Sequence, residues 1–127
     1  MPKTWPAVVL VEDDERLRDA LTGVLSISGL RVATFATAES ALEEAPWSTA
    51  ACLIVDIRLP GMPGLELLRR LRGRGDAMPA IVITADMRRA TRDAAMRLGV
   101  SAYLEKPVPG RALAAAVRKA ISKGSDD

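Results

Sequence analysis

The sequence predicts one α/β domain made of five strand–helix units, a (βα)5 arrangement with a single parallel sheet. Apolar runs rich in β-branched residues at 7–11, 52–55 and 80–84 have the composition of strands buried on both faces. Segments with helical spacing separate these runs, and such alternation is typical of a doubly wound parallel sheet with helices on both faces. The length of 127 residues corresponds to one domain, so we expect residues 1–127 to form a single unit.

The clearest helix signals follow the first strand. Asp14 can cap the start of a helix, and Gly29 can end it. The apolar side chains between them recur at the spacing of one helix face: Leu17, Leu21, Val24 and Leu25. Similar signals predict the other elements: a strand at 30–35 nearer the sheet edge, a helix from the Thr37 cap through Glu44, helices at 65–72 and 86–98, a strand at 102–105, and a last helix opened by Pro109. We expect residues 123–127 to be a frayed or linker-like tail.

Composition narrows the class of function. The net charge is only +2, and the pairs Arg69-Arg70 and Arg88-Arg89 favour solvated helix faces over a nucleic-acid surface because no aromatic residues interleave them. The single cysteine, Cys52, lies in an expected buried strand without a histidine partner, which favours a structural role. No apolar stretch approaches the roughly 18 residues of a membrane span. The first residues do not read as a signal peptide, so we expect a cytoplasmic location and no membrane contact.

Polar residues stand at the ends of four predicted strands. Glu12 and Asp13 follow the first strand, Asp56 follows the third, Thr84 ends the fourth, and Lys106 follows the fifth. In an open α/β sheet the carboxyl ends of the parallel strands share one edge, where ligands bind. We therefore expect these residues, far apart in the sequence, to lie together.

The chemistry of this set points to phosphoryl transfer. Glu12, Asp13 and Asp56 supply the hard oxygen ligands that Mg²⁺ prefers, and clustered carboxylates need such neutralisation. Lys106 supplies a compact positive charge suited to a phosphoryl oxygen, and Thr84 offers a hydroxyl. Transfer then needs mainly positioning and charge neutralisation, with Asp56 as the nucleophile that forms an acyl phosphate.

Each of these residues also has a simpler interpretation. Glu12 and Asp13 can belong to an acidic helix start, and Asp56 can be a cap or a turn former. Thr84 can be an ordinary strand-end threonine, and Lys106 a surface lysine. The order of acid pair, aspartate, hydroxyl and Lys-Pro, each at a strand end, has few competing explanations.

These motifs resemble the receiver domain of two-component response regulators, the fold of the single-domain chemotaxis regulator. The resemblance covers residues 7–121 and rests on four segments: 10–15 (LVEDDE), 56–64 (DIRLPGMPG), 83–85 (ITA) and 103–107 (YLEKP). It implies a flavodoxin-like sheet with the strand order 2-1-3-4-5. Three acids compete for two family positions. Since Val11 ends the strand, we assign the family's acid pair to Glu12 and Asp13, which leaves Asp14 as the helix cap.

The resemblance implies Asp56 as the phosphoacceptor and Mg²⁺ as the cofactor. It assigns Asp13 as a direct metal ligand, Glu12 as a ligand through water, and the backbone carbonyl of Arg58 as a further ligand. Lys106 would contact the phosphoryl group, ahead of a cis peptide to Pro107.

The resemblance also implies a two-state switch. Thr84 would move toward the phosphoryl oxygen while Tyr103 turns inward behind it. This motion would repack the surface of the fourth helix, fifth strand and fifth helix, so that one charged group biases a protein-binding face. The small side chain of Ala85 leaves access beside the phosphate.

Two further charges suggest control over the lifetime of the phosphorylated form. Arg58 lies two residues after Asp56, and Asp86 lies two residues after Thr84. Both should flank the mouth through which water reaches the phosphoryl group. We hypothesise that they pair across this mouth and slow hydrolysis, although they can equally be two separate exposed charges.

A receiver of this kind would take its phosphoryl group from a sensor histidine kinase or a phosphotransfer protein. The Leu59-Pro60 turn and residues 103–107 resemble the nitrogen-fixation-regulator subgroup, whose receivers precede a helix-turn-helix domain. Regulation of transcription and contact with nucleic acid would need such an output domain, which residues 1–127 do not include. Homodimerisation on phosphorylation stays open.

Two other functions compete with the receiver. A Mg²⁺-dependent phosphatase of the haloacid-dehalogenase type also uses a strand-end aspartate, but it usually has a second aspartate two residues later, where this sequence has Arg58. It usually also carries a cap domain, for which there is no room here. A phosphate-independent interaction module is disfavoured because Asp13, Asp56, Thr84 and Lys106 are all present. We therefore expect self-phosphorylation and autodephosphorylation, not turnover of a separate substrate.

Overall fold

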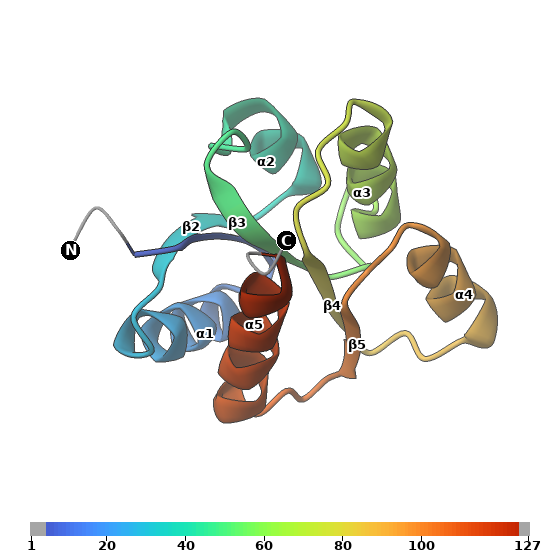
Figure 1. Cartoon of the computed structure of the whole chain (residues 1–127). Coiled ribbons are helices and arrows are strands. Elements are labelled where there is room, and N and C mark those ends of the chain that lie inside the picture. Colours follow the sequence, from blue (N-terminus) through green and yellow to red (C-terminus); the bar gives the residue numbers. More distant parts are fainter. Residues whose placement is uncertain (1–4, 125–127) are drawn as a thin grey trace.

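The computed structural model describes residues 5–124, and strands and helices alternate along them (Figure 1). The elements are β1 (Ala7–Val11), α1 (Glu15–Ile27), β2 (Arg31–Phe35), α2 (Ala38–Glu44), β3 (Ala50–Val55), α3 (Gly64–Gly73), β4 (Ala80–Thr84), α4 (Arg89–Arg97), β5 (Ala102–Glu105) and α5 (Gly110–Gly124). The expectations for residues 1–4 and 125–127 lie outside the described residues.

The five strands form one parallel sheet in the order β2-β1-β3-β4-β5, which confirms both the predicted order and β2 as an edge strand. At the carboxyl edge, Val11 pairs with Val55 of β3, and Thr84 pairs with Glu105 of β5. The residues that follow these strands therefore meet at one edge of the sheet, as predicted.

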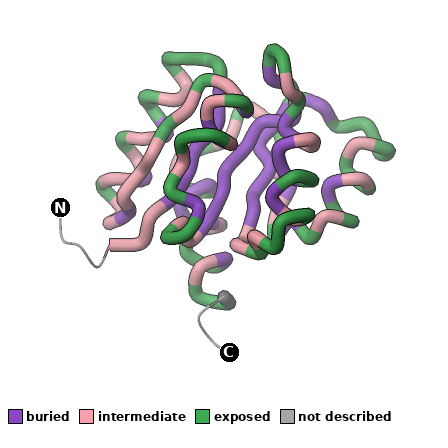
Figure 2. Tube along the Cα trace, turned by 90° about the horizontal axis from the view of Figure 1, so that it is seen from above, coloured by how far each residue is buried: buried purple, intermediate pink, exposed green. Residues whose placement is uncertain are grey.

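Helices cover both faces of the sheet, so that the strands form the buried centre of the molecule (Figures 1 and 2). On one face, Leu21 and Leu25 of α1 and Leu113 of α5 pack with Val8 and Leu10. On the other face, the core is formed with residues from α2, α3 and α4: Ala38, Ala41, Leu67, Leu68, Leu71 and Ala95. Successive residues of the central strands face opposite cores, which is why β1 and β3 are apolar throughout and β4 is apolar up to Thr84.

The predicted caps are confirmed. The side chain of Asp14 accepts a hydrogen bond from the backbone N–H of Leu17 at 3.2 Å, and Thr37 caps α2 by accepting from Ser40 N–H at 3.1 Å. Cys52 is fully buried in β3, and burial raises the pKa of its thiol to about 12, as a structural cysteine requires.

Three element boundaries differ from the predictions. β3 begins at Ala50, two residues early, because an irregularity in register lets Ala50 pair with Ala7. α4 begins at Arg89 and not at Asp86, because the Asp86 carboxylate binds the N–H of Arg88 and holds the preceding turn. α5 includes Lys123 and Gly124, which we had expected in the frayed tail.

No helix within residues 5–124 combines the length and apolar character needed to cross a bilayer.

The start of α3 depends on a glycine. Gly64 lies against the backbone after β3, where its N–H donates to the carbonyl of Ile57 at 3.0 Å. A Cβ at this position would collide with the backbone carbonyl of Asp56 and lie 3.1 Å from the Cα of Ile57. Gly64 therefore folds the turn after β3 back onto the chain that carries Asp56.

We predict that Gly64→Ala lowers the free energy of unfolding by about 1–3 kcal/mol, the usual cost of overpacking. Gly73→Ala at the other end of α3 is the matched control, since nothing lies within 4 Å of its added Cβ. This control should be neutral or gain up to about 1 kcal/mol from helix propensity. Urea unfolding of both variants measures the difference, and equal stabilities would contradict the close approach at Gly64.

Candidate functional site

The carboxyl edge of the sheet brings together the predicted charged residues of β1, β3 and β5. Lys106 Nζ lies 2.7 Å from Glu12 Oε1 and 2.5 Å from Asp56 Oδ2, so one ammonium joins two carboxylates. Glu12 is fully buried, Asp56 is 4% exposed, and Asp13 is exposed beside them. The predicted cluster is therefore real, although its members are 94 residues apart at the extremes (12 to 106).

Backbone hydrogen bonds fix these residues because the ladder continues just past each strand. Glu12 N–H donates to the carbonyl of Phe35 at 3.0 Å, and Asp56 N–H donates to the carbonyl of Val11 at 3.2 Å. Lys106 N–H donates to the carbonyl of Thr84 at 2.9 Å, ahead of a cis peptide to Pro107. The predicted cis peptide is thus confirmed.

The electrostatics of the site follow from burial and pairing. Burial raises the pKa of Glu12, against the opposing effect of Lys106. Burial acts to lower the pKa of Lys106, but its hydrogen bonds and charge interactions with Asp56 and Glu12 outweigh burial and raise this pKa. Lys106 therefore stays protonated between the two acids.

The acidic residues fit a hard divalent cation. Carboxylate oxygens of Glu12, Asp13 and Asp56 all lie within 4.8 Å of one another. Oε1 of Glu12 is buried, and although Lys106 is near it, the oxygen has no hydrogen bond of good geometry among the described residues. A set of three carboxylates matches the oxygen ligands that Mg²⁺ takes.

Thr84 and Tyr103 meet at the turn after β4. The hydroxyl of Thr84 is buried and accepts a hydrogen bond from Asp86 N–H at 3.1 Å. The side chain of Tyr103 is turned inward, 9% exposed, and its hydroxyl donates to the backbone carbonyl of Asp86 at 2.5 Å. Both predicted switch residues are therefore hydrogen-bonded to the backbone of Asp86, Thr84 through its N–H and Tyr103 through its carbonyl.

Asp86 departs from its expected exposure. It is 3% exposed, and its carboxylate is bound by Arg88 through Nε at 3.0 Å and Nη2 at 2.7 Å. The hypothesised pair with Arg58 is present, with Nε of Arg58 3.6 Å from Asp86 Oδ2, but it is the longer of the two ion pairs. The Arg88 hydrogen bonds hold the pKa of Asp86 far below its usual range, although burial opposes this shift. Asp86 is thus an anion enclosed by arginines and not a free surface charge.

An open hollow of about 550 Å³ leads to this site. Its walls include Asp13, Arg58, Asp86 and Arg88, with apolar residues of the turn after β3 on one side. Arg58 and Asp86, which the sequence analysis expected to flank the mouth of the site, both line this hollow, together with Arg88.

Three contacts around the site were missed from the sequence. Arg88 was assigned to a solvated face, although its place two residues after Asp86 in a turn was a usable signal. Arg18 of α1 donates to the carbonyl of Glu12 at 2.8 Å, and Glu39 of α2 accepts from Met62 N–H at 3.0 Å and so holds the turn after β3. Neither of these two contacts has a local sequence signal, because each joins two distant segments or two elements.

Comparison with known sequences gives the same class of protein. The model of the response regulator receiver domain family matches residues 8–118. The transcriptional regulatory protein FixJ of Azorhizobium caulinodans is 36% identical over 126 residues, which cover 99% of this chain and 59% of FixJ. The C4-dicarboxylate transport transcriptional regulatory protein DctD of Pseudomonas aeruginosa is 39% identical over 120 residues, which cover 90% of this chain and 25% of DctD.

Solved structures show the same fold. The response regulator StyR matches with a TM-score of 0.86 and 34% identity over 97% of this chain and 62% of StyR. The signal receiver domain of a modulated diguanylate cyclase from Desulfovibrio desulfuricans G20 matches with a TM-score of 0.83 and 33% identity, covering 94% of this chain and 95% of that domain.

Fold, site and comparisons define a phosphorylation-dependent signalling module of the doubly wound α/β class. The chain belongs to the response regulator receiver domain family of two-component signalling. It spans between half and three-fifths of the first relatives it matches, FixJ and the transcriptional regulatory protein AfsQ1 of Streptomyces coelicolor.

We predict that Asp13→Asn weakens Mg²⁺ binding by about tenfold or more, since each carboxylate removed deprives a small hard cation of a charged ligand. Asp14→Asn is the matched control, because asparagine caps a helix as well as aspartate does. Calorimetric titration with Mg²⁺ measures both variants. Equal losses would mean that the acid pair had been assigned one residue too early.

Proposed function

We propose that Asp56 accepts a phosphoryl group from a phosphohistidine of a sensor kinase or phosphotransfer protein. The observation that carries this proposal is the Asp56 carboxylate, which Lys106 binds and which lies close to the carboxylates of Glu12 and Asp13. A carboxylate oxygen of Asp56 attacks phosphorus, the bond from phosphorus to the histidine nitrogen breaks, and the imidazole, which already carries a proton on its other ring nitrogen, leaves as a neutral group. An acyl phosphate remains on Asp56.

Each residue of the site would have a separate role in this transfer. Lys106 holds Asp56 in place at 2.5 Å and stays protonated to bind a phosphoryl oxygen. Arg58 N–H donates to Asp56 Oδ1 at 3.0 Å and fixes the plane of the carboxylate. Glu12, Asp13, Asp56 and the backbone carbonyl of Arg58 would hold Mg²⁺, which neutralises charge on the transferred group when bound.

The switch would pass from Thr84 to α4. Thr84 accepts a hydrogen bond from Asp86 N–H, so a rotation of its side chain to donate to a phosphoryl oxygen would break this bond and disturb the turn that Tyr103 and Arg88 also hold. α4 begins right after this turn and buries only Ala95, so it can shift with little loss of buried area. We propose the surface of α4, β5 and α5 as the face that reports phosphorylation.

Arg58 also supports a signalling role over an enzymatic one. It occupies the place where the competing phosphatase class has its acid/base aspartate, and its guanidinium pairs with Asp86. We propose that the domain loses its phosphoryl group slowly by autodephosphorylation. Control of transcription through an output domain, a homodimer on phosphorylation and a cytoplasmic location stay predictions.

We predict that incubation with acetyl phosphate and Mg²⁺ adds one phosphoryl group, seen by intact mass. Asp56→Asn should abolish the adduct because the nucleophilic carboxylate is lost, and EDTA should prevent it in the wild type. Asp76→Asn is a control outside the site, where the carboxylate pairs with Arg74. An adduct on the Asp56→Asn protein would refute the assignment.

We predict that Arg58→Ala shortens the half-life of the acyl phosphate by up to about fivefold, because a partly exposed ion pair contributes about 0.2–1 kcal/mol. Its loss opens the mouth to water. Arg89→Ala removes an exposed arginine that makes no ion pair among the described residues, and it should leave the half-life unchanged. Decay of the phosphorylated mass after donor removal measures this, and an unchanged half-life in Arg58→Ala removes the hypothesis.

A further inference from the structure

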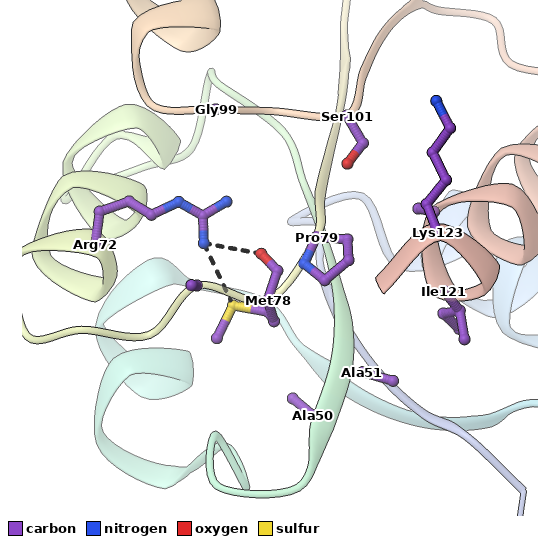
Figure 3. A pocket seen from close by; sticks show the side chains of 11 residues that line it. Ala50, Ala51, Arg72, Met78, Pro79, Gly99, Ser101, Ile121 and Lys123 are labelled. Atoms are coloured by element: carbon purple, nitrogen blue, oxygen red, sulfur yellow. Dashed lines mark hydrogen bonds between the residues drawn. The ribbon is translucent and has the colours of Figure 1, made fainter. Parts of the chain in front are cut away.

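A second cleft lies at the opposite, amino edge of the sheet (Figure 3). Its volume is about 620 Å³. It lies between the end of α3, the starts of β3 and β4, the segment before β5 and the last turns of α5. It shares no lining residue with the hollow at the phosphoacceptor.

Arg72 of α3 supplies a fixed positive charge to this cleft. Its guanidinium donates to the backbone carbonyls of Leu98 at 2.9 Å, Asp76 at 2.9 Å and Met78 at 2.8 Å, through Nε and Nη1. The carboxylate of Asp76 pairs with Arg74 instead. Nη2 donates no hydrogen bond within residues 5–124, so one edge of the guanidinium is left for a ligand. Burial lowers the pKa of Arg72, and the nearby charge of Asp76 opposes this shift without forming an ion pair with the guanidinium.

Other polar groups of the cleft match this charge. Ser101 turns its hydroxyl toward the space beside Arg72, and Lys123 of α5 rises on the other side of that space (Figure 3). An adjoining hollow shares Ser101 and Lys123 and adds Lys119. No acidic residue lines either space in the described chain. Three cations around two spaces that have no acidic lining residue among the described residues attract anions.

The remaining wall of the cleft is apolar. Pro79 and the side chain of Met78 lie below the Arg72 guanidinium, and Ala50, Ala51 and Ile121 complete the wall (Figure 3). Small side chains leave the space open, and Arg72 is already fixed by its carbonyl partners, so little ordering is needed on binding.

We propose that this cleft binds a small ligand that carries a carboxylate or phosphate on an apolar body. The anionic group would lie between Arg72, Ser101 and Lys123, and the apolar body would cover Pro79 and Met78. This site would be separate from the phosphoacceptor and independent of its chemistry.

The test uses phenyl phosphate, benzoate and benzyl alcohol as probes, each titrated into the ¹⁵N-labelled protein without Mg²⁺. The two anions separate phosphate from carboxylate recognition, and the alcohol reports apolar contact alone. We expect saturable amide shifts at Ala51, Gly99 and Ser101 with at least one anion and none with the alcohol. Phenyl phosphate that shifts only the amides around Thr84 and Lys106 would show binding at the phosphoacceptor and would overturn the proposal.

Single-residue variants then show which polar groups of the cleft bind the anion. Lys123→Gln should raise the dissociation constant about two- to fivefold, the effect of one partly exposed charge. Arg111→Gln removes a cation from the first turn of α5, about 18 Å away along the helix, and should leave binding unchanged. Ser101→Ala removes the hydroxyl and leaves the hydrogen bonds from Arg72 to backbone carbonyls intact. Equal binding by Lys123→Gln, Ser101→Ala and the wild type, or equal shifts with benzyl alcohol, would overturn the proposal.

Discussion

One ammonium group shared by two buried acids is the interaction on which the site depends. Lys106 binds Glu12 at 2.7 Å and Asp56 at 2.5 Å, and these residues follow β5, β1 and β3. Removing one partner of a buried ion pair leaves an uncompensated charge, at a cost of about 3–5 kcal/mol. The three strand ends are therefore held together by charge as well as by the sheet, and any cation entering the site must compete with Lys106 for oxygens it already binds.

The parallel sheet makes this shared ion pair available from distant parts of the sequence. Each of the three residues donates its backbone N–H to a neighbouring strand or strand end, so its position is set by the ladder and not by a loop. For this reason the strand-end residues could be predicted from the sequence: an apolar run that ends in a polar residue defines both the strand and the edge. Asp14 could be separated from Glu12 and Asp13 because the strand ends at Val11.

What could not be predicted depends on side-chain geometry between elements. Arg88 reaches back to Asp86 with both ends of its guanidinium, and that geometry delays the start of α4 by three residues, from 86 to 89. The Arg58 pair was foreseen only because Arg58 stands two positions after Asp56 and Asp86 two positions after Thr84. Arg72 carried no signal at all, since its partners are backbone carbonyls, which every sequence provides.

The contacts of Asp86 and Arg88 and those of Arg72 lie at opposite ends of α4. Its first turn is held by Asp86 and Arg88 beside the phosphoacceptor, and the carbonyl of Leu98 at its other end is held by Arg72 in the opposite cleft. Between them α4 buries only Ala95, so polar contacts at its ends, more than apolar burial, fix its position. β4, by contrast, is buried along its whole length and cannot move without disturbing both cores. A helix held at its ends by hydrogen bonds and charge, next to a rigid strand, is the element whose position a new anion at the phosphoacceptor would change most easily.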